Sequence, residues 1–273
     1  TRIGIAIDDG IIDPKKADAD LPRDMIALMS SWPEHRAALE RAATRKADVP
    51  LSAVKLEAPV PRPGKILAIG LNYADHIEES GQKTPEQQLW FCKHVTSINA
   101  PFAPVQMPKV SMLLDYEAEL VAVIGKRCKH VPKEKAHEVI FGYAAGNDVT
   151  VRDWQFKTPQ WMLGKSFDTH APFGPWIVTP DEIGDPHALG IRAFVNGEKR
   201  QESNTKHLVF NVFDQIAHLS QAMTLEPGDI IFTGTPAGVG AAMKPPQFLK
   251  VGDVTRIEID KIGAIEATVA AEP

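Results

Sequence analysis

The sequence predicts a mostly β protein with some α-helix, of the α+β class. Short runs of β-branched and aromatic residues, bounded by glycine, proline or asparagine, recur along most of the chain and are typical of strands. The dipeptide Asn196-Gly197 between two of these runs predicts a tight hairpin. Helical periodicity interrupts the second half of the chain at one place, from Asn211 to Met223. Because strands outnumber helices, we expect a core built mainly from β-sheet.

The composition is that of a globular protein and argues against several other classes. Its 273 residues are enough for one large domain, alone or with a small appendage. Hydrophobic residues make up 44% and charged residues 24%, and a net charge of −5 gives no support for nucleic-acid binding. No apolar run approaches the ~20 residues needed to span a bilayer, so we expect no membrane association. Cys92 and Cys128 form no Cys-x-x-Cys pair, so we expect neither disulfides nor zinc, and a cytoplasmic location.

Residues 1–60 are expected to form a small N-terminal α/β domain, followed by a larger domain over residues 61–273. The expected elements of the small domain are a hairpin at Thr1–Ile12 with a turn at Asp8-Asp9-Gly10, a helix at Arg23–Ser30, and a helix from Ser31 to about Arg45. Ser31 and Glu34 have the spacing of a capping box. Prolines at positions 50, 59, 61 and 63 follow, and we place the domain boundary among them.

The larger domain reads as strands and turns, with a polar segment near its start. Its expected strands are Lys65–Gly70, Leu89–Cys92, Asp115–Ile124, Trp176–Val178, Ile191–Val195, Ile230–Phe232, and a last hairpin of Arg256–Asp260 with Ala264–Val269. Residues 78–88 are polar and rich in turn formers, so we expect them to be mobile. Residues 100–113 contain three prolines and suit an irregular connection.

Two glutamates stand at the start of the strand that ends at Gly125. Because residues i and i+2 of a strand point to one face, Glu117 and Glu119 are expected side by side, about 6.5–7 Å apart along the chain. Adjacent carboxylates repel unless a proton or a cation lies between them. The pair therefore suits one hard divalent cation, although a lone Glu-x-Glu on a strand is more often a solvated face.

Asp148 is the best candidate for a third carboxylate ligand. It follows Gly146-Asn147 at the end of a short apolar run, and we expect it to begin a helix. Arg152 at i+4 and Gln155 at i+7 would then share its helical face. A carboxylate, a guanidinium and an amide would project together, whereas by itself an Asp–Arg pair at this spacing is usually a surface salt bridge.

Several motifs, in their order along the chain, resemble those of the fumarylacetoacetate hydrolase family. The motifs are Gly70-Leu-Asn-Tyr73-Ala-Asp-His76-Ile-Glu-Glu79, Glu117-x-Glu119, Asp148-x-x-x-Arg152-x-x-Gln155, Gly164-Lys165-Ser-Phe, and Thr233-Gly-Thr235-Pro-Ala-Gly-Val-Gly240. The resemblance covers about residues 60–270 and favours the branch of acylpyruvases and fumarylpyruvate hydrolases. It implies the family's β-roll, a folded-over mixed β-sandwich with the site at its open end, and a homodimer. It also implies Mg²⁺ or Mn²⁺, with Ca²⁺ as a substitute, at Glu117, Glu119 and Asp148.

The resemblance also assigns roles to the groups around the expected metal. His76 and Glu79, at i and i+3, would form a general-base pair on a closing lid, and Lys165 would stay charged and stabilise an enolate. The substrate would be bound by Arg152, Gln155, Tyr73 and Thr235. The segment around Thr235 lacks the Gly-Lys-Ser/Thr ending of a phosphate loop. The other histidines are expected to be structural or exposed, with His94 and His170 the least settled.

Two segments depart from the pattern of the family. Phe91–Ser97 and the loop Thr158–Met162 differ from many relatives, so the sequence leaves the substrate's acyl group open. The leading expectation is a metal-dependent hydrolase that cleaves a C–C bond in an acylpyruvate or related 2,4-diketo acid. The alternatives are an oxaloacetate decarboxylase or keto–enol isomerase of the same family, and a metal-binding protein without turnover.

Overall fold

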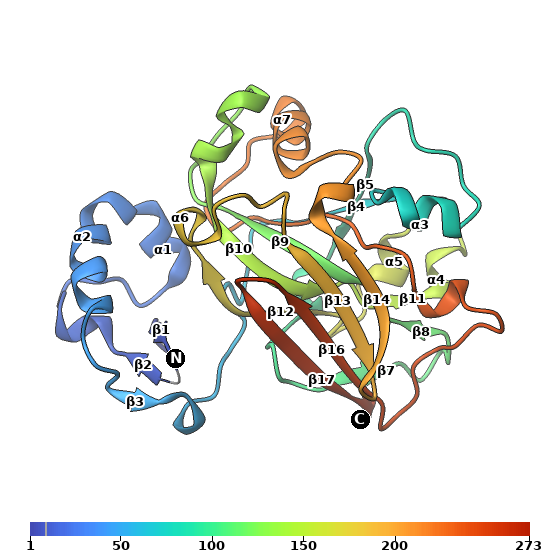
Figure 1. Ribbon diagram of the computed structural model, residues 1–273, viewed down its shortest axis with the longest axis horizontal. Helices are drawn as coiled ribbons and strands as arrows, with labels where there is room; N and C mark the ends of the chain where they lie inside the picture. Colours follow the sequence, from blue (N-terminus) through green and yellow to red (C-terminus); the bar gives the residue numbers. More distant parts are fainter. Residues whose placement is uncertain (9) are drawn as a thin grey trace.

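A three-stranded sheet and two helices form the N-terminal part of the computed structural model, which describes residues 1–8 and 10–273. The sheet contains β1 (Ile5–Ile7), β2 (Gly10–Ile12) and β3 (Val49–Pro50), and the helices are α1 (Met25–Ser30) and α2 (Trp32–Ala43). The predicted hairpin is confirmed by the antiparallel pairing of β1 with β2, although Asp9 of its predicted turn lies outside the described residues. Figure 1 shows this part in blue at one end of the molecule. The division at residue 60 stays a prediction.

The predicted capping box at the start of α2 is wrong. The Ser31 hydroxyl donates to the carbonyl of Ala27 at 2.9 Å and makes no cap for α2. Since α1 and α2 follow one another with only Ser31 between them, this side chain closes the end of the first helix instead. The cap of α1 itself is Asp24, whose carboxylate accepts from the backbone N–H of Ala27 at 3.0 Å.

The main sheet has seven strands, in the order β5-β4-β15-β9-β10-β12-β6. Their bounds are Leu89–Lys93, Ile66–Gly70, Ile230–Phe232, Ala118–Ile124, Ile140–Asn147, Ala171–Val178 and Ile98–Asn99. The strand at its centre, β9, is buried over its whole length, as its near-continuous apolar sequence requires. It pairs antiparallel with β10 on one side and with β15 on the other.

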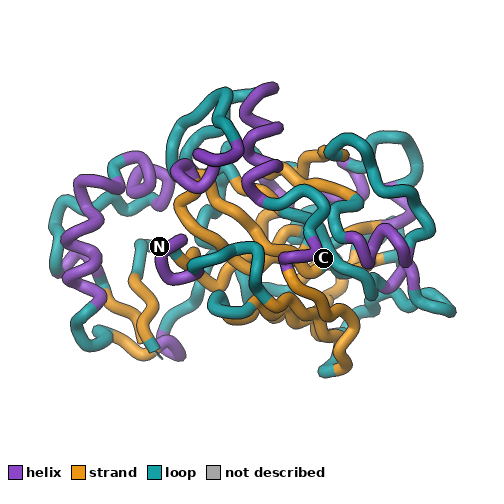
Figure 2. Tube along the Cα trace, turned by 45° about the horizontal axis from the view of Figure 1, so that its top comes forward, coloured by secondary structure: helices purple, strands orange, loops and turns teal. Residues whose placement is uncertain are grey.

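A second sheet of five strands, in the order β14-β13-β16-β17-β7, packs against the first. Their bounds are Glu198–Asn204, Gly190–Val195, Val254–Ile259, Gly263–Ala271 and Val105–Met107. The predicted hairpin turn is confirmed, since Asn196 and Gly197 both have positive φ values, 52° and 79°, as a type I′ turn requires. Side chains from both sheets, such as Leu120 and Ile257, share one apolar core. Figures 1 and 2 show the sheets curling around this interior, which confirms the predicted β-rich α+β fold.

Short helices and a two-stranded ribbon complete the larger part of the chain. The ribbon pairs β8 (Leu114–Asp115) with β11 (Thr150–Val151). The helices are α3 (Ala74–Glu79), α4 (Arg152–Gln155), α5 (Met162–Lys165), α6 (Pro180–Ile183) and α7 (Val212–Ala222). In Figure 1, α3, α4 and α5 gather at the end of the sheets remote from the N-terminal part. Among the described residues, no helix is both long and apolar enough to cross a membrane.

Candidate active site

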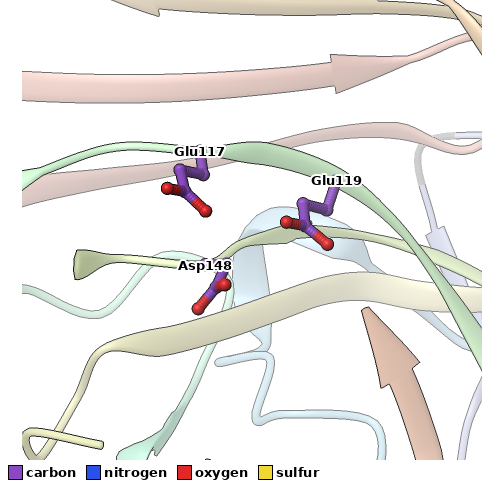
Figure 3. Close-up of side chains that lie close together, drawn as sticks. All are labelled: Glu117, Glu119 and Asp148. Carbon is purple, nitrogen blue, oxygen red and sulfur yellow. The ribbon is translucent and has the colours of Figure 1, made fainter. Parts of the chain in front are cut away.

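Three buried carboxylates meet where β9 begins and β10 ends. Glu117 precedes β9, Glu119 lies within it, and Asp148 follows β10. The antiparallel register places Gly146 opposite Glu119, and the backbone N–H of Asp148 donates to the carbonyl of Glu117 at 2.9 Å. One oxygen from each carboxylate lies within 4.8 Å of the others, and Figure 3 shows the three groups facing a common space. The sheet therefore assembles the cluster predicted from the Glu-x-Glu spacing.

The helix predicted to begin at Asp148 does not exist. The chain continues into β11, and α4 begins only at Arg152, so the three predicted side chains do not share one helical face. The pairing of β11 with β8 overrides the local helical preference and carries α4 to the cluster. There, Nη1 of Arg152 lies 2.7 Å from Oε1 of Glu117 and donates to Oε1 of Gln155 at 3.0 Å. Arg152 thus joins the site through Glu117 instead of Asp148.

Lys165 bridges two of the three carboxylates. Its Nζ lies 2.7 Å from Oε2 of Glu117 and 2.8 Å from Oδ2 of Asp148. Burial opposes its charge, but these two carboxylates outweigh burial and raise the pKa of Lys165. The preceding glycine allows the approach, because a Cβ on Gly164 would come within 2.2 Å of the backbone of Gln155. An ammonium is therefore held against the carboxylate cluster.

Sequence reasoning missed Lys93. Its Nζ, at the end of β5, donates to Oδ1 of Asp148 at 2.5 Å and to the carbonyl of Val149 at 3.2 Å. Burial lowers its pKa even though Asp148 opposes the shift. A lysine on an otherwise apolar strand was the available signal, because buried lysines are almost always paired.

Asp115 was also given no role, although it stands in the acidic motif. Its carboxylate lies 2.8 Å from Nε of Arg152 and accepts from the backbone N–H groups of Gly240 at 2.8 Å and Ala241 at 2.9 Å. Asp115 is fully buried. It therefore fixes the guanidinium of Arg152 and connects it to the loop that follows β15.

The charges of the cluster suit a divalent cation. The buried charged side chains in and next to the cluster are the carboxylates Asp115, Glu117, Glu119 and Asp148, and the cations Lys93, Arg152 and Lys165. Four carboxylates against three cations leave one negative charge unbalanced. Burial, followed by the charges of Asp148 and Glu117, raises the pKa of Glu119 well above its usual range. Its Oε2 accepts from the backbone N–H of Gly234 at 2.7 Å. Oxygen donors with excess negative charge are what Mg²⁺ and Mn²⁺ require.

The predicted acid–base pair lies on α3. Nδ1 of His76 is 3.3 Å from Oε2 of Glu79, as expected for positions i and i+3 of a helix. Ile77, between them, is buried and holds the helix to the body of the protein. Burial opposes the charge of Glu117, but Lys165 and Arg152 lower the pKa of this carboxyl, and His76 adds a smaller contribution in the same direction. The imidazole therefore belongs to the electrostatic environment of the cluster.

Tyr73 and Thr235 both lie near the site and are buried. The Tyr73 hydroxyl has no hydrogen-bond partner among the described residues, and burial and then Glu119 raise its pKa well above the usual range. A buried, unpaired hydroxyl beside the cluster fits a site that receives a polar ligand. Oγ1 of Thr235 accepts from the side chain of Gln201 at 2.9 Å, which leaves its own proton free to donate.

The prediction that the segment around Thr235 is not a phosphate loop is confirmed. In the described chain it is followed by the 3₁₀ turn Gly240–Ala242 and not by an α-helix. Of the two histidines left unsettled by the sequence, His94 is exposed, and its backbone N–H donates to Oγ of Ser166 at 3.1 Å. His170 is fully buried, and its Nε2 lies 2.7 Å from the carbonyl of Gln106.

The similarity of this chain to a known family covers the curled sheets, the buried carboxylates and the lysine that bridges two of them. Residues 65–270 match the family model described as fumarylacetoacetate (FAA) hydrolase C-terminal. The chain belongs to the fumarylacetoacetate hydrolase family, as the motifs predicted. This is a family of enzymes that includes hydrolases, isomerases and tautomerases.

Known relatives cover nearly the whole chain. It is 44% identical over 272 residues to mitochondrial oxaloacetate tautomerase fahd2 of Xenopus laevis, covering 97% of this chain and 84% of that protein. Maleylpyruvate hydrolase of Sphingobium sp. SYK-6, solved with a manganese(II) ion and pyruvate, has a TM-score of 0.83 at 37% identity, covering 100% of this chain and 97% of that one. A 5-carboxymethyl-2-hydroxymuconate delta-isomerase from Mycobacterium smegmatis has a TM-score of 0.73 at 42% identity, covering 82% and 85%. The cytoplasmic location and the homodimer stay predictions.

Proposed function

We propose that this chain is a divalent-metal-dependent tautomerase that interconverts the keto and enol forms of oxaloacetate or a similar 2-oxo acid. The observation that carries the proposal is the cluster of Glu117, Glu119 and Asp148, bridged by Lys165, in a chain 44% identical to an oxaloacetate tautomerase. Tautomerisation replaces C–C hydrolysis as the leading function, because the oxaloacetate tautomerase is 44% identical to this chain and the maleylpyruvate hydrolase 37%.

The reaction moves one proton from C3 of the oxo acid to the oxygen on C2, and no other atom is gained or lost. A Mg²⁺ or Mn²⁺ ion held by the three carboxylates would act as a Lewis acid and make the C3 proton more acidic. His76, oriented by Glu79, would accept that proton from C3 and then return it to the oxygen on C2, which completes the exchange. Lys165 keeps its proton, because the neighbouring carboxylates raise its pKa, and it would stabilise negative charge on the oxygen at C2.

Arg152 and Gln155 would orient the carboxylate and carbonyl oxygens of the 2-oxo acid. The guanidinium is held by Asp115 and Glu117, and it in turn fixes the amide oxygen of Gln155. The amide nitrogen of Gln155 is thereby presented as a donor for a carboxylate or carbonyl oxygen. Thr235 would donate its hydroxyl proton to the substrate carboxylate, since its oxygen already accepts from Gln201.

Hydrolysis of a C–C bond in an acylpyruvate is the second candidate. The similarity to maleylpyruvate hydrolase supports it, and so does the His76–Glu79 pair, which has the composition needed to activate water. Water would add to the distal carbonyl, and the bond to the pyruvate carbon would break with that carbon taking the electron pair and a proton. Both candidates use the same oxo-acid head at the cluster.

One assay separates the two candidates. Oxaloacetate is followed by the ultraviolet absorbance of its enol, and acylpyruvates are followed by loss of enol absorbance together with pyruvate release, each with and without Mg²⁺. The proposal predicts Mg²⁺-dependent acceleration of the oxaloacetate keto–enol exchange. Pyruvate release from acylpyruvates without that acceleration would favour hydrolysis, and Mg²⁺ binding with neither activity would leave only a metal-binding protein.

The role of His76 is tested in the same assay. The His76→Ala variant should lose roughly 10²–10⁴-fold in the rate of tautomerisation, the usual effect of removing a general base. His218→Ala, on the exposed face of α7, is the matched control and should retain the full rate. Equal rates in wild type and His76→Ala would remove His76 from the proposed mechanism.

A further inference from the structure

Three aromatic side chains lead from the carboxylate cluster toward the surface. Phe91 lies on β5 two residues before Lys93, so both side chains face the same side of the sheet. The centroid of the Phe91 ring is 5.0 Å from Nζ of Lys165. The ring of Trp161 lies 5.7 Å from that of Phe91 and 6.3 Å from that of Phe156. We refer to Phe91, Trp161 and Phe156 as the aromatic wall.

The aromatic wall packs against the segment that leads from β4 to Tyr73 and His76. A Cβ on Gly70 would come within 2.3 Å of the Trp161 ring, so the indole lies directly against the Gly70 backbone. Gly70 ends β4, and the chain continues from it to Tyr73 and His76. The wall thus adjoins both Lys165 and the chain that supplies the acid–base pair.

The wall offers apolar surface that the fold does not use. Phe91 and Trp161 are only partly buried, and Phe156 is 66% exposed. Leu163, on the neighbouring α5, is 52% exposed. Exposed apolar side chains next to a group of buried polar side chains are typical of ligand sites. Within residues 1–8 and 10–273, Lys165 is the only cation recorded over any of the three rings. The wall therefore suits an uncharged apolar group.

We propose that the aromatic wall binds an apolar substituent at the distal end of the substrate. On this basis the site accepts 2-oxo or 2,4-dioxo acids with an alkyl or aryl group, and not only oxaloacetate. The inference rests on the proposed function, because the cluster must first bind the oxo-acid head. An aryl group on Trp161 removes apolar area from water and gains from ring–ring contact. Oxaloacetate ends in a carboxylate, which gains neither.

The test compares two inert ligands that share one head group. Oxamate resembles the enolate of pyruvate, and N-benzyloxamate adds an aryl group to it. Calorimetry in the presence of Mg²⁺ gives both dissociation constants. We expect N-benzyloxamate to bind wild type about tenfold more tightly than oxamate, from roughly 60 Å² of apolar surface buried at about 25 cal/mol per Å². Trp161→Ala should remove most of this difference and leave oxamate binding unchanged within about twofold.

Two further variants make the test specific. Phe156→Ala removes an exposed ring at the outer end of the wall and should reduce the benzyl gain without risk to folding. Phe102→Ala removes another ring, 53% exposed, which lies in the loop between β6 and β7 and should leave the gain intact.

The outcomes distinguish the inference from the function on which it rests. If oxamate binds wild type but the benzyl group adds nothing, the aromatic wall is not a subsite. The same conclusion follows if Trp161→Ala weakens both ligands equally. If oxamate itself does not bind in the presence of Mg²⁺, the proposed function fails, and the inference fails with it.

Discussion

Both carboxylate oxygens of Glu79 accept the backbone N–H of Gly238, at 2.9 and 3.0 Å. The same carboxylate lies 3.3 Å from Nδ1 of His76. Glu79 therefore orients the proposed base and ties α3 to the loop after β15. Gly238 is suited to this position, because its φ is 102° and a Cβ would come within 2.0 Å of the Arg200 carbonyl. Any movement of α3 away from the site must break this contact.

This contact sharpens the prediction of a closing lid. The sequence predicts a lid that carries His76 and continues through the polar residues 78–88. In the structure Ile77 is buried and Glu79 is held by Gly238, so we expect the mobile part to begin after Glu79. Residues 80–88 bury too little apolar surface to offset the roughly 1–2 kcal/mol of backbone entropy per ordered residue. Amide hydrogen exchange should show protection of residues 80–88 rising when Mg²⁺ and oxalate bind, as the segment closes. Unchanged exchange there would mean that the segment takes no part in binding.

Replacement of Asp115 by asparagine should damage both folding and substrate binding. The carboxylate is fully buried, and its two oxygens accept from Arg152 and from the backbone N–H groups of Gly240 and Ala241. The NH₂ group of an asparagine would face one of these donors, which breaks the buried pair and leaves buried groups unpaired. We expect Asp115→Asn to lower the free energy of unfolding by about 3–5 kcal/mol in urea titrations. Because Arg152 loses its fixed orientation, the KM for the oxo acid should rise more than kcat falls.

Asp260→Asn is the matched control for this prediction. Asp260 also pairs with an arginine, with 2.6 Å between its Oδ1 and Nη2 of Arg192, but both side chains are substantially exposed. Surface pairs contribute about 0–1 kcal/mol, so the control should cost far less than Asp115→Asn. Similar losses in the two variants would show that Asp115 is not the structural centre of the site.

His170 should make the fold sensitive to acid. Its Nε2 faces a carbonyl and therefore carries a proton to donate, and burial, as the main cause, lowers the pKa of His170 to about 3. The unfolded chain, with a pKa near 6.5, takes up a proton that the folded chain refuses. The free energy of unfolding should therefore fall as pH drops from about 6.5 toward 3, by at most about 1.4 kcal/mol per pH unit from this group.

The measurement is chemical unfolding at a series of pH values between 7 and 5. His170→Asn removes the titrating group and should give a flatter dependence than wild type. His218→Ala removes an exposed histidine of α7 and should leave the slope as it is in wild type. Parallel slopes for wild type and His170→Asn would show that His170 does not contribute to acid sensitivity.

The strands and the central carboxylates could be predicted from the sequence because they follow from local pattern. The two-residue period of a strand places Glu117 and Glu119 on one face without knowledge of any partner. Asp148 was correctly grouped with them through the family motif, but the local reason was wrong. The segment after it forms β11, paired with β8, and such pairing between distant segments leaves no signal in a short stretch of chain.

The contributions of Lys93 and Asp115 depend on topology. Lys93 reaches Asp148 because β5 pairs with β4, which places this edge of the sheet beside the cluster. Asp115 reaches Gly240 across more than a hundred residues of sequence. Contacts of this kind arise from the order of strands in the sheet, which a single sequence does not reveal. The aromatic wall was not predicted, because the sequence marks Thr158–Met162 as a departure from the family pattern without indicating that Trp161 contacts Phe91.

The measurement that tests the central claim most directly is Mn²⁺ binding, followed by calorimetry and by the electron paramagnetic resonance of free Mn²⁺. The account predicts one bound ion per chain and a changed spectrum of the bound ion when oxalate is added. It also predicts tighter binding at higher pH, because the proton held by Glu119 competes with the metal. Glu119→Ala should abolish binding with the fold intact, whereas Glu138→Ala, an exposed glutamate away from the cluster, should bind as wild type does. Unchanged Mn²⁺ affinity in Glu119→Ala, or no binding by wild type, would contradict the account.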